Sequence, residues 1–286
     1  MAKVEATVFE DLLPSVDRDW LASTLQSLEE VSLSCMARTV PESSVVAYSA
    51  GIDSGIMAEL QRRMKDEATL LTIGRSESPD AKAARDDRLS NTPGYRCVTE
   101  HIGVQDVENA ALKVSKLVAV SSLSHFEDCV SFWLIARAAS GIGDAKCILS
   151  ANGPDELYCG YDRFRRIVDE FGYRAVELEI KKSLESAYKL KNQVATVVSE
   201  FGFETREPFL HDEFRDFALK IRPEFKILKG NDRIRKRIWR AFGRSLGLSE
   251  VTVGRQKKAM QYGMGIHQVV LSMVKKDKIE IMSDVN

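Results

Sequence analysis

The 286-residue chain lacks several features that mark whole classes of protein. Its 5 cysteines are odd in number and include no Cys-x-x-Cys pair, so the sequence indicates neither a disulfide framework nor a zinc cluster. Its 4 histidines are scattered without ligand spacing, which favours surface or packing roles over metal binding. The 41 basic and 42 acidic residues leave a net charge of −1, so no overall field attracts nucleic acid or an anionic membrane.

Long hydrophobic runs are also missing. No stretch approaches the roughly 18 apolar residues of a membrane-spanning helix, and residues 1–5 show no signal-peptide pattern, so we expect no membrane partner and a cytoplasmic location. We find no internal repeat, low-complexity tract or long linker. A chain of 286 residues can bury a large core as one large domain or two intimate ones, and the composition is that of a soluble enzyme.

Alternating strand and helix signals predict a parallel α/β sheet. Strands are expected at residues 45–48, 69–73, 96–102 and 146–150, with helices at 17–38, 54–66, 79–90, 105–120 and 126–140. The first of these helices should pack against the sheet, and Ser78 should cap the helix that begins at Pro79. No strand is predicted after Gly160. The expected organisation is a helical segment at 1–40, an α/β core at 41–160 and a mainly helical C-terminal lobe at 161–286, folded over the carboxyl edge of the sheet.

The most informative segment is the apolar strand at residues 45–48, which runs into the small-residue loop 49–54 and then into a helix. Small residues let backbone N–H groups close around an anion, and the helix adds unpaired N–H groups and the positive end of its dipole. Asp53 could hold a magnesium ion against phosphates. The segment therefore predicts a nucleotide loop, with a structural turn as the alternative.

A second buried strand, at residues 146–150, opens into the loop 151–161, which carries the adjacent carboxylates Asp155 and Glu156. Parallel strands deliver their loops to one edge of a sheet, where α/β folds bind ligands. Both loops can therefore face one nucleotide. We predict that Asp53 and Asp155 share one metal ion.

Several ordered segments resemble one known family. Residues 49–54 look like the SGGxDS pyrophosphate loop of the N-type ATP pyrophosphatases, and residues 149–161 resemble the LSGEGSDEIFGGY stretch of asparagine synthetases. Further matches to VG…SPDxKAA, ExRxPFLD, KxxLR and RQK…GxG fall in the same order, at residues 73–84, 204–210, 236–240 and 255–265. The resemblance, from about residue 28 to about residue 267, implies a Rossmann-like adenine nucleotide alpha hydrolase fold, the PP-loop ATP pyrophosphatase domain, with a helical C-terminal lobe.

The resemblance implies an ATP-dependent carbon–nitrogen ligase. A substrate carboxylate, aspartate as the first guess, would attack the α-phosphate of ATP to give an acyl-adenylate and pyrophosphate, and an amine would then displace AMP. Asp53 and Asp155 would hold Mg²⁺, and Lys257 would stabilise charge on the reacting oxygens, although a solvated lysine in a basic run is the plainer alternative. The residues implied to bind the nucleotide are Tyr48, Ser49, Ala50, Gly51, Ile52, Asp53, Ser54, Ile73, Ser150 and Ala151.

Two positions depart from the family pattern. Ala50 replaces the first loop glycine, where a methyl group is tolerable if φ is negative. Asn152 stands at the glutamate of GEG, and asparagine cannot act as a general base. The chain would then use another base, Tyr158 or Glu156 being the first to test, take a different nucleophile, or amidate poorly. A degenerate nucleotide-binding relative is therefore an alternative.

The source of the amine is the last open point. Glutamine-dependent relatives carry a nucleophilic cysteine after the initiator methionine, whereas Ala2 follows Met1 here, so we expect free ammonia, another amine or a separate glutaminase subunit to serve. The basic run at residues 226–240 is either a solvated helix face or a phosphate or tRNA site, which keeps a PP-loop tRNA-modifying enzyme as the main rival. Overall charge, the lack of paired cysteines and the motif matches favour the synthetase. The sequence does not indicate an oligomeric state.

Overall fold

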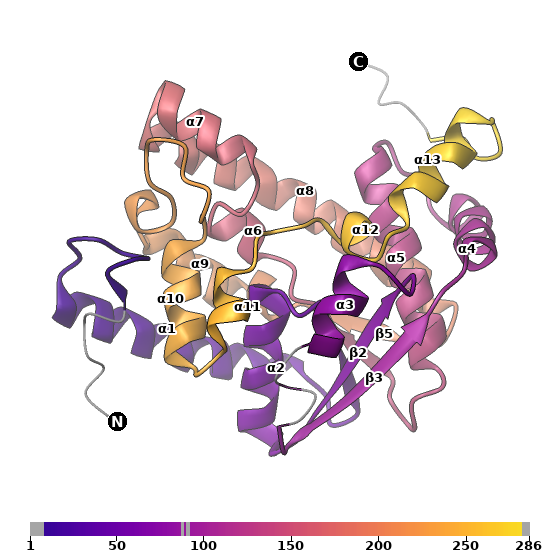
Figure 1. The fold of residues 1–286 in the computed structure, drawn as a ribbon, viewed down its shortest axis with the longest axis horizontal. Helices are drawn as coiled ribbons and strands as arrows, with labels where there is room; N and C mark the ends of the chain where they lie inside the picture. Colours follow the sequence, from indigo (N-terminus) through magenta and orange to yellow (C-terminus); the bar gives the residue numbers. More distant parts are fainter. Residues whose placement is uncertain (1–8, 87–88, 90–91, 282–286) are drawn as a thin grey trace.

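The computed structural model describes residues 9–86, 89 and 92–281 (Figure 1). These residues form a 5-stranded, all-parallel sheet in the order β3-β2-β1-β4-β5, which confirms the predicted fold class. The strands are β1 (Ser44–Ala47), β2 (Ala68–Gly74), β3 (Tyr95–His101), β4 (Cys147–Leu149) and β5 (Glu204–Arg206). Strand order reverses between β1 and β4, and ligands bind at such switch points beyond the carboxyl ends of the strands.

β5 shows that the prediction of no strand after Gly160 is wrong. It pairs with β4 through three residues, with Leu149 opposite Arg206. Its side chains are mostly polar and only Thr205 is buried, so neither length nor apolar alternation marks it in the sequence. Residues 204–206 form a strand because they pair with the edge of β4 that would otherwise be free. Its consequence for the site is that residues 207–210 are delivered to the carboxyl edge beside the loop that follows β4.

Helices cover both faces of the sheet. They are α1 (Arg18–Thr39), α2 (Ile52–Lys65), α3 (Pro79–Asp86), α4 (Val104–Leu117), α5 (Leu123–Ala139), α6 (Pro154–Leu157), α7 (Arg163–Phe171), α8 (Tyr173–Ser199), α9 (Asp212–Lys220), α10 (Arg237–Ser245), α11 (Glu250–Gly254), α12 (Met260–Gly263) and α13 (His267–Lys275), with 3-10 turns η3 (Pro208–Leu210) and η4 (Pro223–Phe225). The predicted helices up to residue 140 match α1 to α5 within a few residues, except that residues 87–88 and 90 of the helix expected at 79–90 lie outside the described part of the chain.

The predicted cap at the start of α3 is confirmed. Ser78 Oγ accepts a hydrogen bond from the backbone N–H of Ala81 at 3.4 Å, and Pro79 occupies the first helical position, where no N–H is needed. Asp17 caps α1 in the same way by accepting from Trp20 N–H at 2.8 Å. Local capping chemistry therefore sets where these two helices begin.

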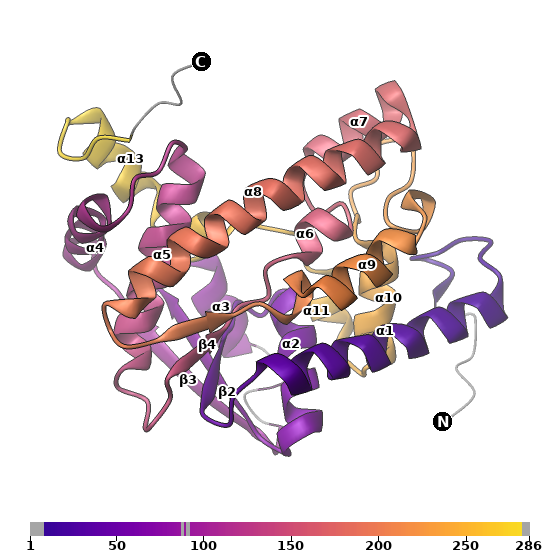
Figure 2. The same ribbon diagram turned by 180° about the vertical axis from the view of Figure 1, so that it is seen from behind.

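Each strand contributes to two cores because neighbouring side chains point to opposite faces. Val46 and Leu149 lie in one buried cluster with α1, α2, α9 and α10, whereas Val45 and Ile148 lie in the other with α4, α5 and α13. The 27-residue α8 contributes its first half to one cluster and its second half to the other, and Figure 2 shows it extending from beside α5 to beside α7.

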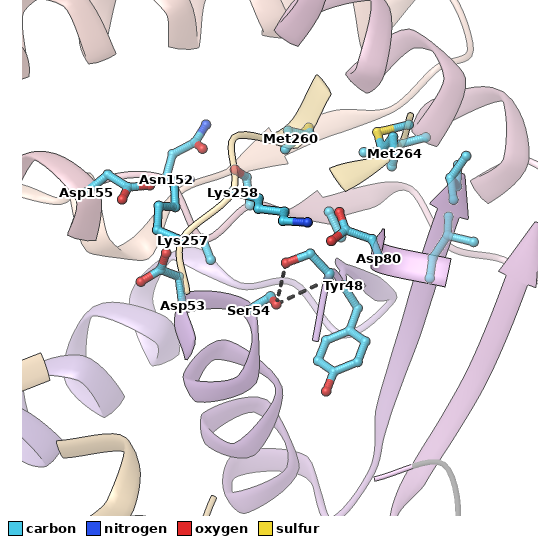
Figure 3. A pocket seen from close by; sticks show the side chains of 17 residues that line it. Tyr48, Asp53, Ser54, Asp80, Asn152, Asp155, Lys257, Lys258, Met260 and Met264 are labelled. Atoms are coloured by element: carbon cyan, nitrogen blue, oxygen red, sulfur yellow. Dashed lines mark hydrogen bonds and ion pairs between the residues drawn. The ribbon is translucent and has the colours of Figure 1, made fainter. Parts of the chain in front are cut away.

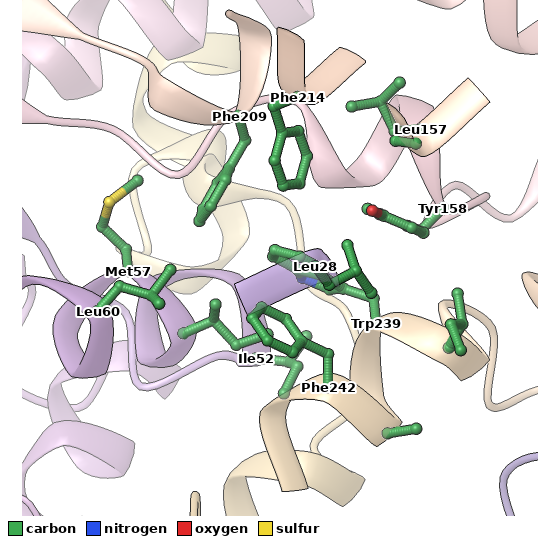
Figure 4. Packing of buried hydrophobic residues seen from close by; sticks show 14 of the residues in the cluster. Leu28, Ile52, Met57, Leu60, Leu157, Tyr158, Phe209, Phe214, Trp239 and Phe242 are labelled. Atoms are coloured by element: carbon green, nitrogen blue, oxygen red, sulfur yellow. The ribbon is translucent and has the colours of Figure 1, made fainter. Parts of the chain in front are cut away.

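The first cluster centres on Trp239, which is fully buried (Figure 4). Tyr158 stacks on its ring at 4.9 Å, and Phe209 meets it edge-on at 5.0 Å. α1 joins this cluster, which also includes Val46 and Leu149 of the sheet, and it packs mainly against α2, α9, α10 and η3. Among the described residues, no helix combines the length and hydrophobicity that a membrane-spanning segment needs.

Candidate active site

A cleft with an open volume of about 670 Å³ lies at the carboxyl ends of β1, β2 and β4 (Figure 3). The predicted site residues that line it are Tyr48, Ser49, Asp53, Ser54, Ile73, Ser150, Ala151, Asn152, Asp155 and Lys257. In Figure 3, Asp53, Asp155 and Lys257 gather on one side of the cleft, and Met260 and Met264 lie on the other. Asp80 and Lys258 also line the cleft on the side of the two methionines, so charged and apolar groups both occur there.

In the loop after β1, hydroxyl groups bind two backbone N–H groups, and no side chain caps the start of α2. The Ser49 N–H donates to Ser54 Oγ at 3.2 Å, and the Gly51 N–H donates to Ser49 Oγ at 3.4 Å. Gly51 is the N-cap of α2 and no side chain bonds to this cap, so none competes there with an anion for the first-turn N–H groups. Ala50, Gly51 and Ile52 do not line the cleft, and the Ile52 side chain lies in the core.

Two loop residues adopt the left-handed conformation that favours glycine. Ala50 has a φ of 55°, so the negative φ that would tolerate its methyl group is not found. Cys159, in the loop after β4, has a φ of 61° at a position where the family pattern quoted above has glycine. This conformation costs a residue with a side chain about 1–2 kcal/mol. Backbone strain is therefore stored in both loops that border the cleft, as is common at functional sites.

The predicted meeting of Asp53 and Asp155 is confirmed, and a lysine joins them. Lys236 Nζ lies 2.6 Å from Asp53 Oδ2 and 2.6 Å from Asp155 Oδ1. Lys257 Nζ lies 2.6 Å from Asp155 Oδ2, so the alternative of a solvated Lys257 is wrong. We call these four residues the carboxylate–lysine cluster. Trp239 Nε1 donates to Asp53 Oδ1 at 2.9 Å and so fixes one carboxylate from the core side.

Charge within the carboxylate–lysine cluster is balanced. Burial alone would raise the pKa of Asp155, but the ammonium groups of Lys236 and Lys257 outweigh it and hold that pKa well below its usual value. Burial would likewise lower the pKa of Lys257, but the carboxylates of Asp155 and Asp53 raise it. Asp155 is therefore held as a carboxylate and Lys257 as an ammonium group at neutral pH.

Lys236 is a residue of this cluster that sequence reasoning missed, although it is the first residue of the KxxLR match. Arg235 and Lys236 both have a φ of 51°, and these successive left-handed residues end the loop before α10. Asp232 organises the loop by accepting from the Leu228 N–H at 3.0 Å and the Arg237 guanidinium at 2.6 Å. The basic run at residues 226–240 was expected to be a solvated helix face or a phosphate or tRNA site. The first expectation is wrong for part of the run, because Lys226, Lys236, Arg237 and Arg240 are buried.

Glycine is required beside the carboxylate–lysine cluster. A Cβ at Gly160 would lie 2.0 Å from Asp155 Oδ1 and 2.2 Å from Lys236 Cε, closer than real Cβ atoms approach. Only a residue without a side chain lets the loop after β4 approach α10 at this point. The Gly160 position in the family-like segment 149–161 therefore has a steric reason.

Arg255 joins two segments that are far apart in the sequence. Its guanidinium donates to the Asp80 carboxylate at 2.8 Å, to the Pro79 carbonyl at 3.2 Å and to the Ser49 carbonyl. Burial raises the pKa of Asp80, and the Arg255 charge opposes this shift. A Cβ at Gly263 would lie 2.1 Å from Asp80 Oδ2, so that glycine makes room for the carboxylate. The SPDxKAA-like and RQK…GxG-like segments thus form one wall of the cleft.

Two acidic groups near the cleft titrate close to neutral pH. Burial and the Asp155 charge raise the pKa of Glu156 to about 7, and its Oε1 accepts from the Tyr161 hydroxyl at 2.5 Å. Burial also raises the pKa of Asp128, on α5, to about 7; Lys257 opposes this rise and neighbouring acidic groups add to it. Tyr158, suggested as a base, is fully buried, and burial raises its pKa well above its usual value. Glu156 as an alternative base therefore stays a prediction. Asp128 is a second candidate for the same role.

The fold and the cleft define a PP-loop nucleotide-binding domain, with a parallel sheet whose phosphate loop follows β1. A family model described as "Asparagine synthase" matches residues 26–199 and 174–284, so the chain belongs to the asparagine synthase family.

Curated relatives agree with this assignment. The chain is 27% identical over 263 residues to "Putative asparagine synthetase [glutamine-hydrolyzing] 1" of Methanocaldococcus jannaschii, covering 81% of this chain and 47% of the relative. It is 28% identical over 271 residues to "Asparagine synthetase [glutamine-hydrolyzing]" of Sandersonia aurantiaca, covering 90% of this chain and 50% of the relative. For "Asparagine synthetase [glutamine-hydrolyzing] 3" of Arabidopsis thaliana the identity is also 28%, over 90% of this chain and 46% of the relative. The chain spans about half the length of the curated relatives it matches.

Proposed function

We propose that this chain is an ATP-dependent, AMP-forming carbon–nitrogen ligase of the asparagine synthetase type. A carboxylate oxygen of the substrate attacks the α-phosphorus of ATP, and pyrophosphate leaves. The nitrogen of ammonia or another amine then attacks the acyl carbon, and AMP leaves as the amide forms and a proton is released. The observation that carries this proposal is the carboxylate–lysine cluster, which lies where the phosphate loop meets the loop after β4.

Nucleotide binding follows from the lining of the cleft. The adenine lies against Tyr48, Ile73, Ser150 and Ala151, and the phosphates lie toward residues 49–54. The uncapped first turn of α2 supplies N–H groups and the positive end of the helix dipole to the pyrophosphate. Binding the leaving group in this way lowers the barrier to its departure.

The two carboxylates fit a magnesium ion. Oxygens of Asp53 and Asp155 both lie 2.6 Å from a single nitrogen atom, so they converge on one point, and carboxylate oxygens are ligands that Mg²⁺ prefers. Bound Mg²⁺ supplies positive charge to the phosphates. Lys236 and Lys257, released in part from their carboxylates, stabilise the negative charge that develops on the reacting phosphate and carbonyl oxygens.

The amine step needs a group that takes up a proton. Asn152 lines the cleft but cannot take up this proton, whereas Glu156 and Asp128 have pKa values raised to about 7 and can do so near neutral pH. Aspartate is the first candidate for the carboxylate substrate. Ammonia, free or delivered by a separate glutaminase subunit, is the first candidate for the nucleophile.

The decisive experiment measures pyrophosphate release from ATP and Mg²⁺ across a panel of amino-acid carboxylates, with and without ammonium. We expect release to depend on one carboxylate, and amide to form when ammonium is present. Asp53→Ala and Asp155→Ala should abolish release, whereas Asp144→Ala, a change at an exposed site, should leave it intact. Wild-type rates in either cleft variant, with unchanged melting, would refute these roles.

Two further variants separate the steps. Lys257→Ala should lower turnover far more than ATP affinity, because its charge acts mainly in the transition state. If the missing base limits the second step, Asn152→Glu should raise amide formation more than pyrophosphate release, by about a hundredfold or more. One-to-one coupling of the two products in the wild type would exclude that limitation. ATP binding without any pyrophosphate release would instead identify a degenerate nucleotide-binding relative.

The rival tRNA-modifying function loses support from the fold of the basic run. Lys226, Lys236, Arg237 and Arg240 are buried and engaged within the protein, so this run does not present a continuous exposed cationic face. Salt-dependent binding of tRNA, with modification of a base, would reverse that judgement.

A further inference from the structure

A second cluster of chemically active side chains lies outside the cleft, where α1 meets the start of α9. Cys35 is on α1, His211 is the N-cap of α9, and Glu213 is in the first turn of α9. Cys35 Sγ lies 3.5 Å from His211 Nδ1, and one carboxylate oxygen of Glu213 lies within 4.8 Å of both atoms. None of the three residues lines the cleft. Three potential metal ligands of different kinds thus point at one place.

The sulfur–nitrogen distance matches that of a zinc site. Zn–S bonds are about 2.3 Å and Zn–N bonds about 2.0–2.1 Å, so a tetrahedral angle places the two ligand atoms about 3.6 Å apart. The observed separation of Cys35 Sγ and His211 Nδ1 is 3.5 Å. The Glu213 oxygen lies within 4.8 Å of both atoms, and its partly exposed side chain can adjust to a metal. A thiol–imidazole hydrogen bond has about the same length, and the experiment below separates the two.

The chemistry of the three ligands also suits zinc. A thiolate, an imidazole and a carboxylate together match its borderline softness, and three protein ligands leave a fourth position for water. Cys35 is fully buried, whereas the Glu213 side chain is 41% exposed, so one side of the site is covered and the other is accessible.

Three existing interactions must yield to a metal. His211 Nδ1 accepts the N-cap hydrogen bond of α9 from the Glu213 N–H at 3.4 Å, and a metal bound at this nitrogen would replace that bond. Arg38 pairs with Glu213 at 2.8 Å, but both side chains are more than one third exposed, and exposed pairs of this kind contribute little. Burial raises the pKa of the Cys35 thiol, so a metal has to displace its proton. The backbone N–H of Phe214 is directed at this sulfur and would support the thiolate.

We propose that Cys35, His211 and Glu213 form a zinc-binding site that links α1 to α9. This link would also stabilise a segment that packs against one of the loops bordering the cleft. His211 directly follows η3, and the Phe209 carbonyl of η3 lies so close to Gly153, in the loop after β4, that a Cβ on that glycine would be 2.8 Å away. Zinc would therefore stabilise the segment against which this loop packs.

The test uses the whole protein after treatment with a chelator. Zinc is titrated against a chromophoric chelator, and cobalt(II) is then substituted to read out its coordination. We expect one zinc per chain, a thiolate-to-cobalt charge-transfer absorption, and a melting temperature raised by several degrees with zinc. Cys35→Ser should remove the absorption, and His211→Gln should weaken zinc binding by about tenfold or more.

Matched variants provide the controls. His125→Gln, Cys97→Ser and Asp212→Asn change the same residue types outside the proposed ligands and should leave zinc affinity unchanged. Glu213→Gln should weaken binding, in contrast to the neighbouring Asp212→Asn. If Cys35→Ser does not fold, His211→Gln at a half-buried position still tests the site.

The proposal is overturned if the protein binds no stoichiometric zinc, or if cobalt gives no thiolate absorption. It is also overturned if His211→Gln binds zinc as tightly as the wild type. None of these measurements requires ligase activity, so they succeed or fail independently of the proposed function.

Discussion

Replacing Lys236 by methionine tests the carboxylate–lysine cluster most directly. Methionine has a similar length and volume, so the packing around a side chain that is 1% exposed is largely kept while its charge is lost. The carboxylates of Asp53 and Asp155 are only 17% and 14% exposed, and removing one partner from such a buried pair costs about 3–5 kcal/mol. Because Lys257 still neutralises Asp155, we expect the lower end of this range, about 3 kcal/mol at pH 7.

The dependence of this loss on pH identifies its cause. The lysines hold the pKa of Asp155 below its usual value, so its contribution to stability is present above the unfolded-state pKa of about 3.9 and is lost as the pH falls through the folded-state pKa. In the Lys236→Met variant the Asp155 carboxylate loses one of the two charges that lower its pKa, so it becomes easier to protonate. The difference in unfolding free energy between wild type and variant should therefore be largest at pH 7 and should shrink below about pH 4.

Urea unfolding at both pH values measures this difference, and pyrophosphate release measures the catalytic loss, expected to be about a hundredfold or more. Lys229→Met, at an exposed lysine before the same helix, is the matched control; its ammonium group lies 5.6 Å from the Tyr173 ring centroid, so the change should cost less than about 1 kcal/mol. Adding Asp53→Asn to Lys236→Met should restore part of the stability by removing an unpaired charge. A Lys236→Met protein as stable as wild type at pH 7, or a loss equal at both pH values, would refute the reasoning.

Three other substitutions test separate features. Ala50→Gly should raise the unfolding free energy by about 1 kcal/mol, because φ is 55° there and glycine relieves more strain than it adds in entropy; a lower melting temperature would contradict this. Gly160→Ala should abolish pyrophosphate release, since its Cβ would lie 2.0 Å from Asp155 Oδ1, whereas Gly254→Ala, which points into open space, should retain it; equal rates would exclude the steric argument. Burial lowers the pKa of Lys226 from 10.5 to about 8. Between these two pH values the folded state binds fewer protons than the unfolded state, so the stability of the wild type should rise with pH. Lys226→Met should be more stable than wild type by about 1–3 kcal/mol at pH 7 and lack this rise, as urea unfolding at pH 7 and 10 would show.

Local patterns in the sequence determined most of the sheet and its helices. β1, β2 and β4 are short apolar runs bounded by turns, and the cap at Ser78 depends only on the residues that follow it. Parallel strands place their loops at one edge, so the meeting of Asp53 and Asp155 also followed from the order of elements. The motifs indicated the family because they lie in these same loops, where the backbone conformation demands particular residue types.

Tertiary structure decided what depends on distant partners. β5 exists because β4 offers an unpaired edge, and its three residues carry no strand pattern of their own. Lys236 reaches the carboxylates of Asp53 and Asp155 only because two successive left-handed residues turn the chain before α10, and Asp53 is 183 residues away. Cys35 and His211 meet across 176 residues for a similar reason. Periodicity and capping act over a few residues, whereas such contacts form only when the packing of whole helices fixes where each side chain lies.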